Sequence, residues 1–255
     1  MLQLLSRAIV VIMIGLLTAC ATPRPPAPVD KERLSSIKSI AVMTPPKASY
    51  LAYVGAPPST VFVNSVGTAA MSGAIGGLLV GYSQGKASGF DAYVKNKLPD
   101  VDLNRELVET VKADLSRRGY AVQEFLPKTT GSTKPATEGS AEALLELKPD
   151  HVQTDAILVL MPMTAYQAPG PLNSYTRQVF LTAYLVGVSD RKMILSRGYS
   201  YHKHFSDDYS YNTYNGMTED ADKAIDGLRK ALLGFVPSLS AEFDTASAPR
   251  IQASR

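Results

Sequence analysis

A pair of histidines near two aspartates comes closest, in this sequence, to a set of metal ligands. His202 and His204 stand two positions apart on an expected strand, so both point to the same face, and Asp207 and Asp208 follow closely. Two imidazoles and a carboxylate are ligands that Zn²⁺ and Cu²⁺ accept. A third histidine or a cysteine does not lie in range, and a solvated strand end has the same composition. We therefore expect no bound metal and no cofactor, and His202 and His204 remain as metal candidates.

Motifs of the common hydrolases and nucleotide-binding enzymes do not occur in the sequence. No serine stands in a G-x-S-x-G elbow, and neither an H-E-x-x-H pair nor a phosphate-binding glycine loop is present. The sequence thus predicts a protein that is not an enzyme. A metal-binding or hydrolytic enzyme that uses His202 and His204 is the alternative from a different functional class.

Tyrosines crowd the stretch that follows the histidines. Tyr209, Tyr211 and Tyr214 lie in an expected loop with the sequence FSDDYSYNTYN. Tyrosine offers a large contact area and a polar tip at low entropic cost, so such a loop is typical of a surface that binds a partner protein. Tyr199 and Tyr201 precede the loop on a strand, where we expect them to fill the inner face.

The single cysteine of the chain, Cys20, closes an apolar segment at the N-terminus. Arg7 and the apolar run 8–17 have the build of a secretory signal, and the run is shorter than the ~20 residues that a membrane-spanning helix needs. The sequence LTAC (17–20) resembles the lipobox of bacterial lipoproteins. The resemblance implies cleavage before Cys20 and acylation of Cys20, with palmitate among the acyl groups. Because Ala21 rather than aspartate follows, it also implies transfer to the periplasmic face of the outer membrane.

Length and charge set limits on the mature chain. Removing residues 1–19 from the 255 leaves 236, enough for one good-sized domain, and the formal net charge falls from +3 to +2 with the loss of Arg7. A charge so near neutral does not indicate nucleic acid as a partner. With Cys20 acylated, no thiol remains for a disulfide or a metal site, so the fold depends on its core.

A glycine-rich insert spans residues 64–89, and no charged residue occurs between Lys47 and Lys86. Glycines recur there at every fourth residue, and on a helix they would form one ridge that lets another helix approach closely. The insert resembles the glycine-zipper segments of membrane-associated bacterial proteins, which implies helix packing or oligomerisation. A flexible glycine-rich loop has the same composition, and each glycine weakens a water-exposed helix by about 1 kcal/mol. Both alternatives stay open. The glycines concerned are Gly73, Gly77, Gly81 and Gly85.

Periodicity predicts an α/β fold, with α+β as the alternative: a mixed sheet of about five strands with helices packed on it, plus the glycine-rich apolar insert. Asp102 caps one helix and Gly119 ends it, residues 162–171 form a connection, and Pro237 ends the last helix. Strand 177–188 alternates in hydropathy, so we expect one buried face. The expected strands are 36–43, 120–125, 155–161, 177–188 and 193–204, and the expected helices are 102–118, 140–147 and one that starts at Asn215 or Thr218.

These features divide the chain into four parts. Residues 1–19 are the signal peptide, 20–35 the acylated cysteine with a proline-rich tether, 36–238 the periplasmic domain that carries the insert, and 239–255 a disordered tail.

The order of elements resembles the α/β domain of periplasmic lipoproteins such as the curli-secretion lipoprotein and the lipoprotein activators of penicillin-binding proteins. The segments IKSIAVMTPP (37–46), LVETVKADLSRRGYAV (107–122) and TDAILVLMPM (154–163) carry the resemblance, which covers about residues 40–46 and 100–236. The two alternating strand pairs of the curli pore are lacking, so a pore is not expected. The resemblance implies a binding or accessory component of an envelope assembly or transport complex, whose partner is an envelope protein or a second copy of the chain.

Overall fold

A computed structural model describes residues 29–54, 86–125, 153–202 and 207–247 of the chain. Cys20, the four glycines of the predicted ridge, the expected helix 140–147 and His204 lie outside the described residues. Within the described residues, none of the helices has the length and apolar character needed to cross a membrane.

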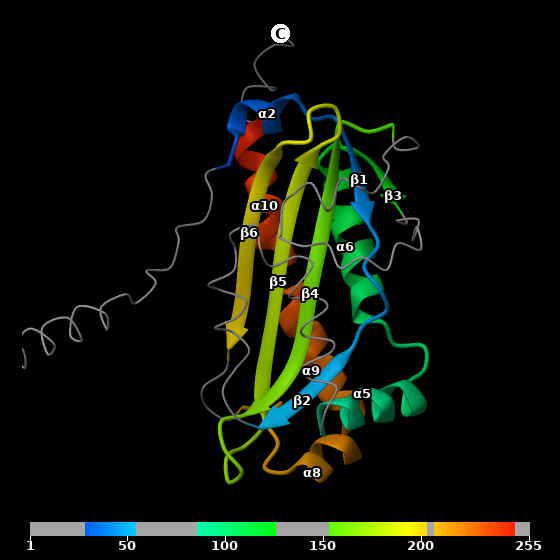
Figure 1. Cartoon of the computed structure of the whole chain (residues 1–255), viewed down its shortest axis with the longest axis vertical. Helices are drawn as coiled ribbons and strands as arrows, with labels where there is room; N and C mark the ends of the chain where they lie inside the picture. The colour runs from blue at the N-terminus through cyan, green and yellow to red at the C-terminus, as the bar shows by residue number, and fades with distance from the viewer. Residues whose placement is uncertain (1–28, 55–85, 126–152, 203–206, 248–255) are drawn as a thin grey trace, which may run out of the picture.

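The described chain forms one mixed sheet of six strands (Figure 1). Five strands lie in the order β3-β1-β4-β5-β6, and β2 pairs with β4 off this path. The α/β fold is confirmed, with one strand more than expected, because β2 was not predicted. The strands are β1 (Ser39–Met43), β2 (Tyr50–Val54), β3 (Ala121–Phe125), β4 (Ala156–Ala168), β5 (Thr176–Gly187) and β6 (Met193–His202).

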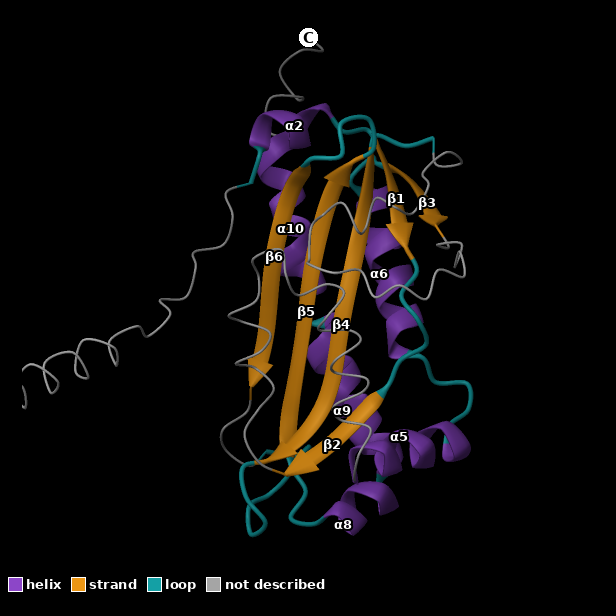
Figure 2. Cartoon of the chain, viewed as in Figure 1, coloured by secondary structure: helices purple, strands orange, loops and turns teal. Residues whose placement is uncertain are grey.

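The long helices cover one face of the sheet (Figure 2). These are α6 (Leu103–Arg117), α9 (Ala221–Leu233) and α10 (Val236–Ser247). The short α2 (Lys31–Ser36) lies at one end of the molecule, and α5 (Lys86–Lys97) and α8 (Tyr214–Glu219) lie at the other end (Figure 1).

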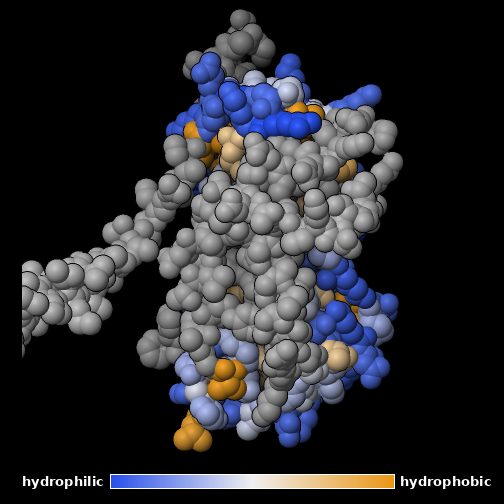
Figure 3. All heavy atoms as spheres, viewed as in Figure 1, coloured by the Kyte–Doolittle hydropathy of each residue, from blue (hydrophilic) through white to orange (hydrophobic). Residues whose placement is uncertain are grey.

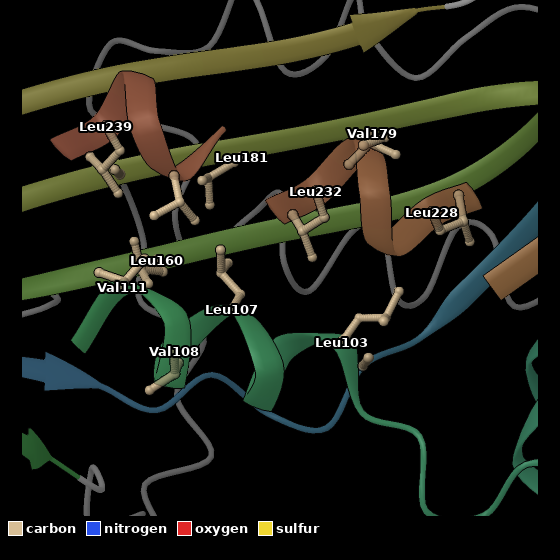
Figure 4. Close-up of a cluster of buried hydrophobic side chains, with 14 of the residues drawn as sticks. Leu103, Leu107, Val108, Val111, Leu160, Val179, Leu181, Leu228, Leu232 and Leu239 are labelled. Carbon is tan, nitrogen blue, oxygen red and sulfur yellow. The ribbon is translucent and has the colours of Figure 1, made fainter. Parts of the chain in front are cut away.

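The main core fills the space between the sheet and these helices (Figure 4). Alternate strand residues point to the helices, as the period of two requires. Helix residues three and four apart point back to the strands, and each of these side chains is at most 1% exposed. The residues that meet are Leu160, Val179 and Leu181 of the sheet, Leu103, Leu107 and Val111 of α6, Leu228 and Leu232 of α9, and Leu239 of α10.

The predicted limits of α6 are confirmed by its caps. The carboxylate of Asp102 accepts hydrogen bonds from the main-chain N–H groups of Asn104 and Arg105, at 3.1 and 3.4 Å. At the other end Gly119 adopts a φ of +89°, a left-handed conformation that glycine accepts at no steric cost.

Strand β4 continues beyond its predicted end to Ala168, so the predicted connection 162–171 is wrong for residues 162–168. Parallel pairing with β1 ends at Val159, and parallel pairing with β2 begins at Thr164. Pro162 falls in the gap between the two pairings. A proline, which has no N–H to donate, is tolerated in a long strand at such a place.

Strand β5 has no solvent-facing side, contrary to the expectation of one buried face. All twelve of its residues are buried. On the face away from the main core, Tyr184 packs with Ile157, Val159 and Ala41 in a second apolar cluster. The alternation of polar and apolar residues in the sequence did not indicate this cluster.

The structure differs from the expected organisation in two segments of the domain map and in the last helix. The tether 20–35 was expected to reach Ser35, but α2 already belongs to the fold, since Leu34 is fully buried. The single last helix is two helices, α8 and α9, separated at Asp220. The disordered tail 239–255 is helical as far as Ser247, because α10 buries Leu239 and Phe243.

Candidate functional site

A buried arginine organises the end of the sheet that carries the tyrosine-rich loop. Arg177, near the start of β5, is only 7% exposed. Its Nη1 donates to the carbonyl oxygen of Gly227 at 3.0 Å. Its Nη2 donates to the hydroxyl of Tyr201 at 2.9 Å and to the carboxylate of Asp207 at 2.5 Å. One guanidinium group therefore ties β5 to β6, to α9 and to the loop after β6.

Aromatic rings and cations alternate outward from this arginine. The guanidinium carbon lies 5.0 Å from the ring centre of Tyr201 and 4.5 Å from that of Tyr209. The ammonium of Lys230 lies 5.1 Å from the same Tyr209 ring. Such cation–π contacts stabilise most where water is excluded. The row runs from the buried Arg177 to Lys230, whose side chain is 60% exposed.

The loop after β6 is closed by the carboxylate of Asp207. The Oδ1 of Asp207 accepts a hydrogen bond from the main-chain N–H of Tyr209 at 2.9 Å, and the main-chain N–H of Asp207 donates to the hydroxyl of Ser210 at 2.9 Å. Burial raises the pKa of Asp207, but the Tyr209 N–H and the Arg177 guanidinium favour the charged form and hold the pKa below its usual value. The carboxylate is thus a charged, structural partner of Arg177.

Gly227 leaves room for this packing in the middle of α9. A Cβ atom at this position would lie 2.6 Å from Cδ1 and 2.9 Å from Cγ of the Tyr209 ring, and 3.0 Å from the hydroxyl of Tyr166. The Tyr166 hydroxyl donates to the carbonyl of Ala224 at 3.1 Å, and burial raises its pKa. Glycine costs a helix about 1 kcal/mol relative to alanine, and here it permits the close approach of Tyr209 to the helix.

Of the three tyrosines of the predicted binding surface, Tyr209, Tyr211 and Tyr214, the structure buries Tyr211. This residue is 8% exposed and exchanges two main-chain hydrogen bonds with Tyr175, at 2.7 and 3.0 Å. Burial raises the pKa of Tyr211 to about 12. Its ring meets that of Tyr166 edge-on, with 5.5 Å between the ring centres. Tyr209 and Tyr214 remain half-buried and reach the surface.

The expected inner positions of Tyr199 and Tyr201 are confirmed. Tyr199 stacks on Phe235 with ring centres 5.8 Å apart, and burial raises its pKa to about 12. Tyr201 contacts Arg177, as described above. Both rings therefore lie on the helix side of the sheet.

Of the two predicted metal candidates, His202 is described and His204 lies outside the described residues. The His202 ring hydrogen-bonds the amide oxygen of Gln178 and lies edge-on to Phe180, with 4.8 Å between the ring centres. Asp207 is engaged by Arg177, and Asp208 is exposed. Within the described ranges, no three histidine, cysteine, aspartate or glutamate side chains lie close enough to hold a metal ion.

Sequence reasoning missed Arg177, although one signal was available. Arg177, Val179 and Leu181 are two residues apart along the strand, so their side chains point to the same face, which is the face expected to meet the core. This spacing places the guanidinium group on the buried face of the strand, where a charged group requires an ion-pair or hydrogen-bond partner.

A second charged cluster joins α6 to β3. The carboxylate of Glu124 accepts hydrogen bonds from the Thr44 hydroxyl at 2.7 Å and the Lys112 ammonium at 3.0 Å, and it also pairs with Arg105. These contacts, led by the Thr44 hydroxyl and Lys112, lower the pKa of Glu124 to about 2. The cluster fixes a helix against an edge strand.

Comparison with known proteins gives partial structural likenesses. No protein-family model and no curated protein matches the sequence. The chain is similar to a neuraminyllactose-binding hemagglutinin homolog from Helicobacter pylori, with 11% identity, a TM-score of 0.39, and coverage of 83% of this chain and 91% of that chain.

Two further solved structures show the same kind of likeness. Lipoprotein GNA1162 from Neisseria meningitidis has 16% identity, a TM-score of 0.26, and coverage of 74% of this chain and 94% of that chain. The C-terminal domain of LpoB from Salmonella enterica has 10% identity, a TM-score of 0.19, and coverage of 69% and 96%. The neighbours thus include bacterial lipoproteins, and at these scores neither family nor function follows from them.

Proposed function

We propose that the protein is an outer-membrane lipoprotein, anchored through acyl chains on Cys20, whose periplasmic domain acts as a binding or accessory component of an envelope assembly or transport complex. The sequence LTAC at 17–20 supports the anchor. The positions of the chain entry and of the candidate site at opposite ends of the domain support the binding role.

The observation that carries the proposal is that the chain joins the fold at one end of β6 and the candidate site lies at the other end. The N–H of Asp30 donates to the carbonyl of Ile194 at 3.1 Å, near the start of β6. Arg177 bonds Tyr201 near the end of the strand. Seven residues of strand separate the two contacts, which is about 23 Å. Figure 1 shows α2, which follows Asp30, at one end of the molecule and α8, which follows the tyrosine-rich loop, at the other.

The end with the candidate site also exposes apolar side chains. Leu172 is fully exposed in the turn between β4 and β5, whose Asn173 N–H donates to the carbonyl of Gly170 at 3.0 Å. Val54, paired with Ala168 at the end of β2, is 45% exposed. Apolar surface is visible at this end in Figure 3. Apolar and tyrosine side chains with a polar rim are typical of a protein-binding surface.

A non-catalytic role agrees with how the charges of the site are used. Arg177 pairs with Asp207, and Lys230 pairs with Asp226 at 2.8 Å. Charged side chains that pair with each other in this way stabilise the conformation of the surface. We propose a protein that binds through this surface without a cofactor.

The anchor is tested by fractionating cells that express Cys20→Ala. One acyl chain gives marginal membrane binding, and further chains make release negligible. We therefore expect the variant to leave the outer-membrane fraction as an uncut precursor. As a matched control, Ala21→Asp should keep the acyl chains and move the protein away from the outer membrane. An outer-membrane location for Cys20→Ala would contradict the proposed anchor.

The binding role is tested by crosslinking in intact cells with the anchored protein as bait. Tyr209→Ser should lower the yield of crosslinked partner several-fold, and Tyr93→Ser, which changes an exposed tyrosine of α5, should leave it unchanged. Thermal unfolding of both variants separates lost binding from lost folding. Equal yields from all three proteins would refute this surface.

A further inference from the structure

Strand β6 forms one edge of the sheet, and its outer side is capped near its start. The main-chain N–H of Asp30 donates a hydrogen bond to the carbonyl oxygen of Ile194. The Nη1 of Arg197 donates to the carbonyl of Ser196 at 3.0 Å, while its Nε pairs with Glu242 of α10 at 2.8 Å. The first half of this edge is therefore covered by α2 and α10 and their flanking residues.

Hydrogen bonds at the end of β5 show which residues of β6 face inward. The N–H of Gly187 donates to Lys192 in the turn that leads to β6, and the N–H of Val188 donates to Asp155 beside β4. Because successive strand residues point their main-chain groups to opposite sides, the odd-numbered residues of β5 face β6. The β6 residues opposite them, Arg197, Tyr199 and Tyr201, therefore bond inward.

The intervening residues Gly198 and Ser200 thus turn their N–H and C=O groups outward. Both residues are exposed. No main-chain hydrogen bond to them from outside the β5–β6 ladder occurs among the described residues. A Cβ atom at Gly198 would meet nothing within 4 Å. Gly198 and Ser200 therefore offer main-chain donors and acceptors that no other described residue outside the ladder uses, and open space lies beside Gly198.

We propose that residues 198–202 of β6 pair with the same residues of a second copy of this chain, antiparallel, across a two-fold axis at Ser200. The sequence Gly-Tyr-Ser-Tyr-His is nearly symmetric about its centre. A two-fold interface requires such self-complementarity, since each residue meets the symmetry-related position of the other copy. The symmetry of the segment selects a second copy over an unrelated strand.

Each pair in this arrangement is chemically matched. Ser200 exchanges two main-chain hydrogen bonds with Ser200 of the other copy. Tyr199 lies opposite Tyr201 on the helix side of the sheet, an aromatic cross-strand pair. The open space at Gly198 receives the His202 ring on the other side. Lysine and proline, which protect sheet edges from pairing, do not occur between Gly198 and His202.

This pairing goes beyond the proposed function and does not depend on the anchor. It is tested by disulfide crosslinking of the full-length protein in membranes after Ser200→Cys. The two Cα atoms of a hydrogen-bonded antiparallel pair lie about 5.5 Å apart, within the range that a disulfide spans. We expect most of the variant to run as a covalent dimer under mild oxidation. Wild type, which has only Cys20, and Ser116→Cys, at an exposed serine of α6, should stay monomeric.

A second measurement uses the purified full-length protein in detergent. Ser200→Pro removes the outward N–H and should weaken self-association at least tenfold in sedimentation, whereas Ser200→Ala keeps the N–H and should behave as wild type. Thermal unfolding confirms that both variants fold. A crosslink no stronger than that of Ser116→Cys, or a monomeric wild type at high micromolar concentration, would overturn the pairing. Neither result bears on the Cys20→Ala fractionation, so the two proposals fail separately.

Discussion

Replacing Arg177 by methionine tests whether one buried guanidinium holds the candidate site together. Methionine keeps most of the volume and removes the charge. The variant loses the hydrogen bonds to Gly227, Tyr201 and Asp207, and it leaves the Asp207 carboxylate, 20% exposed, without its cation. The structure therefore predicts a large loss of stability from a substitution that changes the side-chain volume little.

The expected size follows from the buried pair. Removing one partner of a buried ion pair costs about 3–5 kcal/mol, because the remaining charge stays buried without compensation. A domain is stable by about 5–15 kcal/mol in total. For a domain of this size, such a loss lowers Tm by roughly 10 °C. The matched substitution Arg117→Met removes a guanidinium whose side chain is 74% exposed, and it should change stability by less than about 0.5 kcal/mol.

The effect should depend on pH through Asp207. The folded-state pKa of this carboxyl lies below its ordinary value of 3.8. Its contribution to stability is therefore complete above the unfolded pKa and is lost as the pH falls through the lower folded pKa. In the variant, burial without a cation raises the pKa of Asp207, so this carboxyl protonates at a higher pH than in wild type. The difference in unfolding free energy between wild type and Arg177→Met should therefore be largest near neutral pH and should shrink as the pH falls.

Circular dichroism in urea suits the measurement, since the chain has no tryptophan. Adding Asp207→Asn to Arg177→Met should recover part of the lost stability, because the unpaired charge is then gone. An unfolding free energy of Arg177→Met within about 1 kcal/mol of wild type would refute the reasoning. A difference in unfolding free energy between wild type and Arg177→Met that grows as the pH falls would also refute it.

Three further predictions concern packing and charge. Gly227→Ala places a Cβ against the Tyr209 ring and should cost about 1–3 kcal/mol despite the better helix former, whereas Gly198→Ala, in open space, should be nearly neutral in thermal unfolding. The Glu124 carboxyl should titrate near pH 2 by NMR, so its stabilising contribution is complete above the unfolded value of 4.5 and is lost progressively as the pH falls from there to about 2. A midpoint at the ordinary 4.5 would contradict the Thr44 and Lys112 contacts. Leu228→Asp should unfold the domain, since burying an unpaired carboxylate costs several kcal/mol, and an unchanged Tm would show that α9 does not dock there.

Elements with strong local signals were predictable from the sequence. Helix α6 carries an amphipathic stripe between the cap Asp102 and the terminal Gly119, and all three signals are local. Strand β2 was missed, because its pairing partner is the segment Thr164–Ala168, more than a hundred residues away. Helix α10 was missed because Pro237 suggested a stop, although proline is also favoured in the first turn of a helix.

The candidate site was predictable only in part. The composition of the loop drew attention to Tyr209 and Tyr214, which reach the surface. The burial of Tyr211 depends on its bridge to Tyr175, and the position of Tyr209 depends on the gap at Gly227. Both are contacts between distant segments, which residue types and spacing do not encode.

The position of β1 in the sheet has a consequence for the order of folding. Its described neighbours are β3 and β4, and the carboxylate of Asp155 accepts hydrogen bonds from the N–H groups of Lys38 and Ser39, 117 and 116 residues earlier. Contacts between such distant segments form late, because the closure entropy of the long loop comes first. The antiparallel β4–β5–β6 meander is local and can form before them. A nascent chain therefore holds β2 without its described partner β4, and β1 with β3 alone as a described neighbour, until about the last 100 residues are available. A chain exported from its N-terminus would cross the membrane largely unfolded.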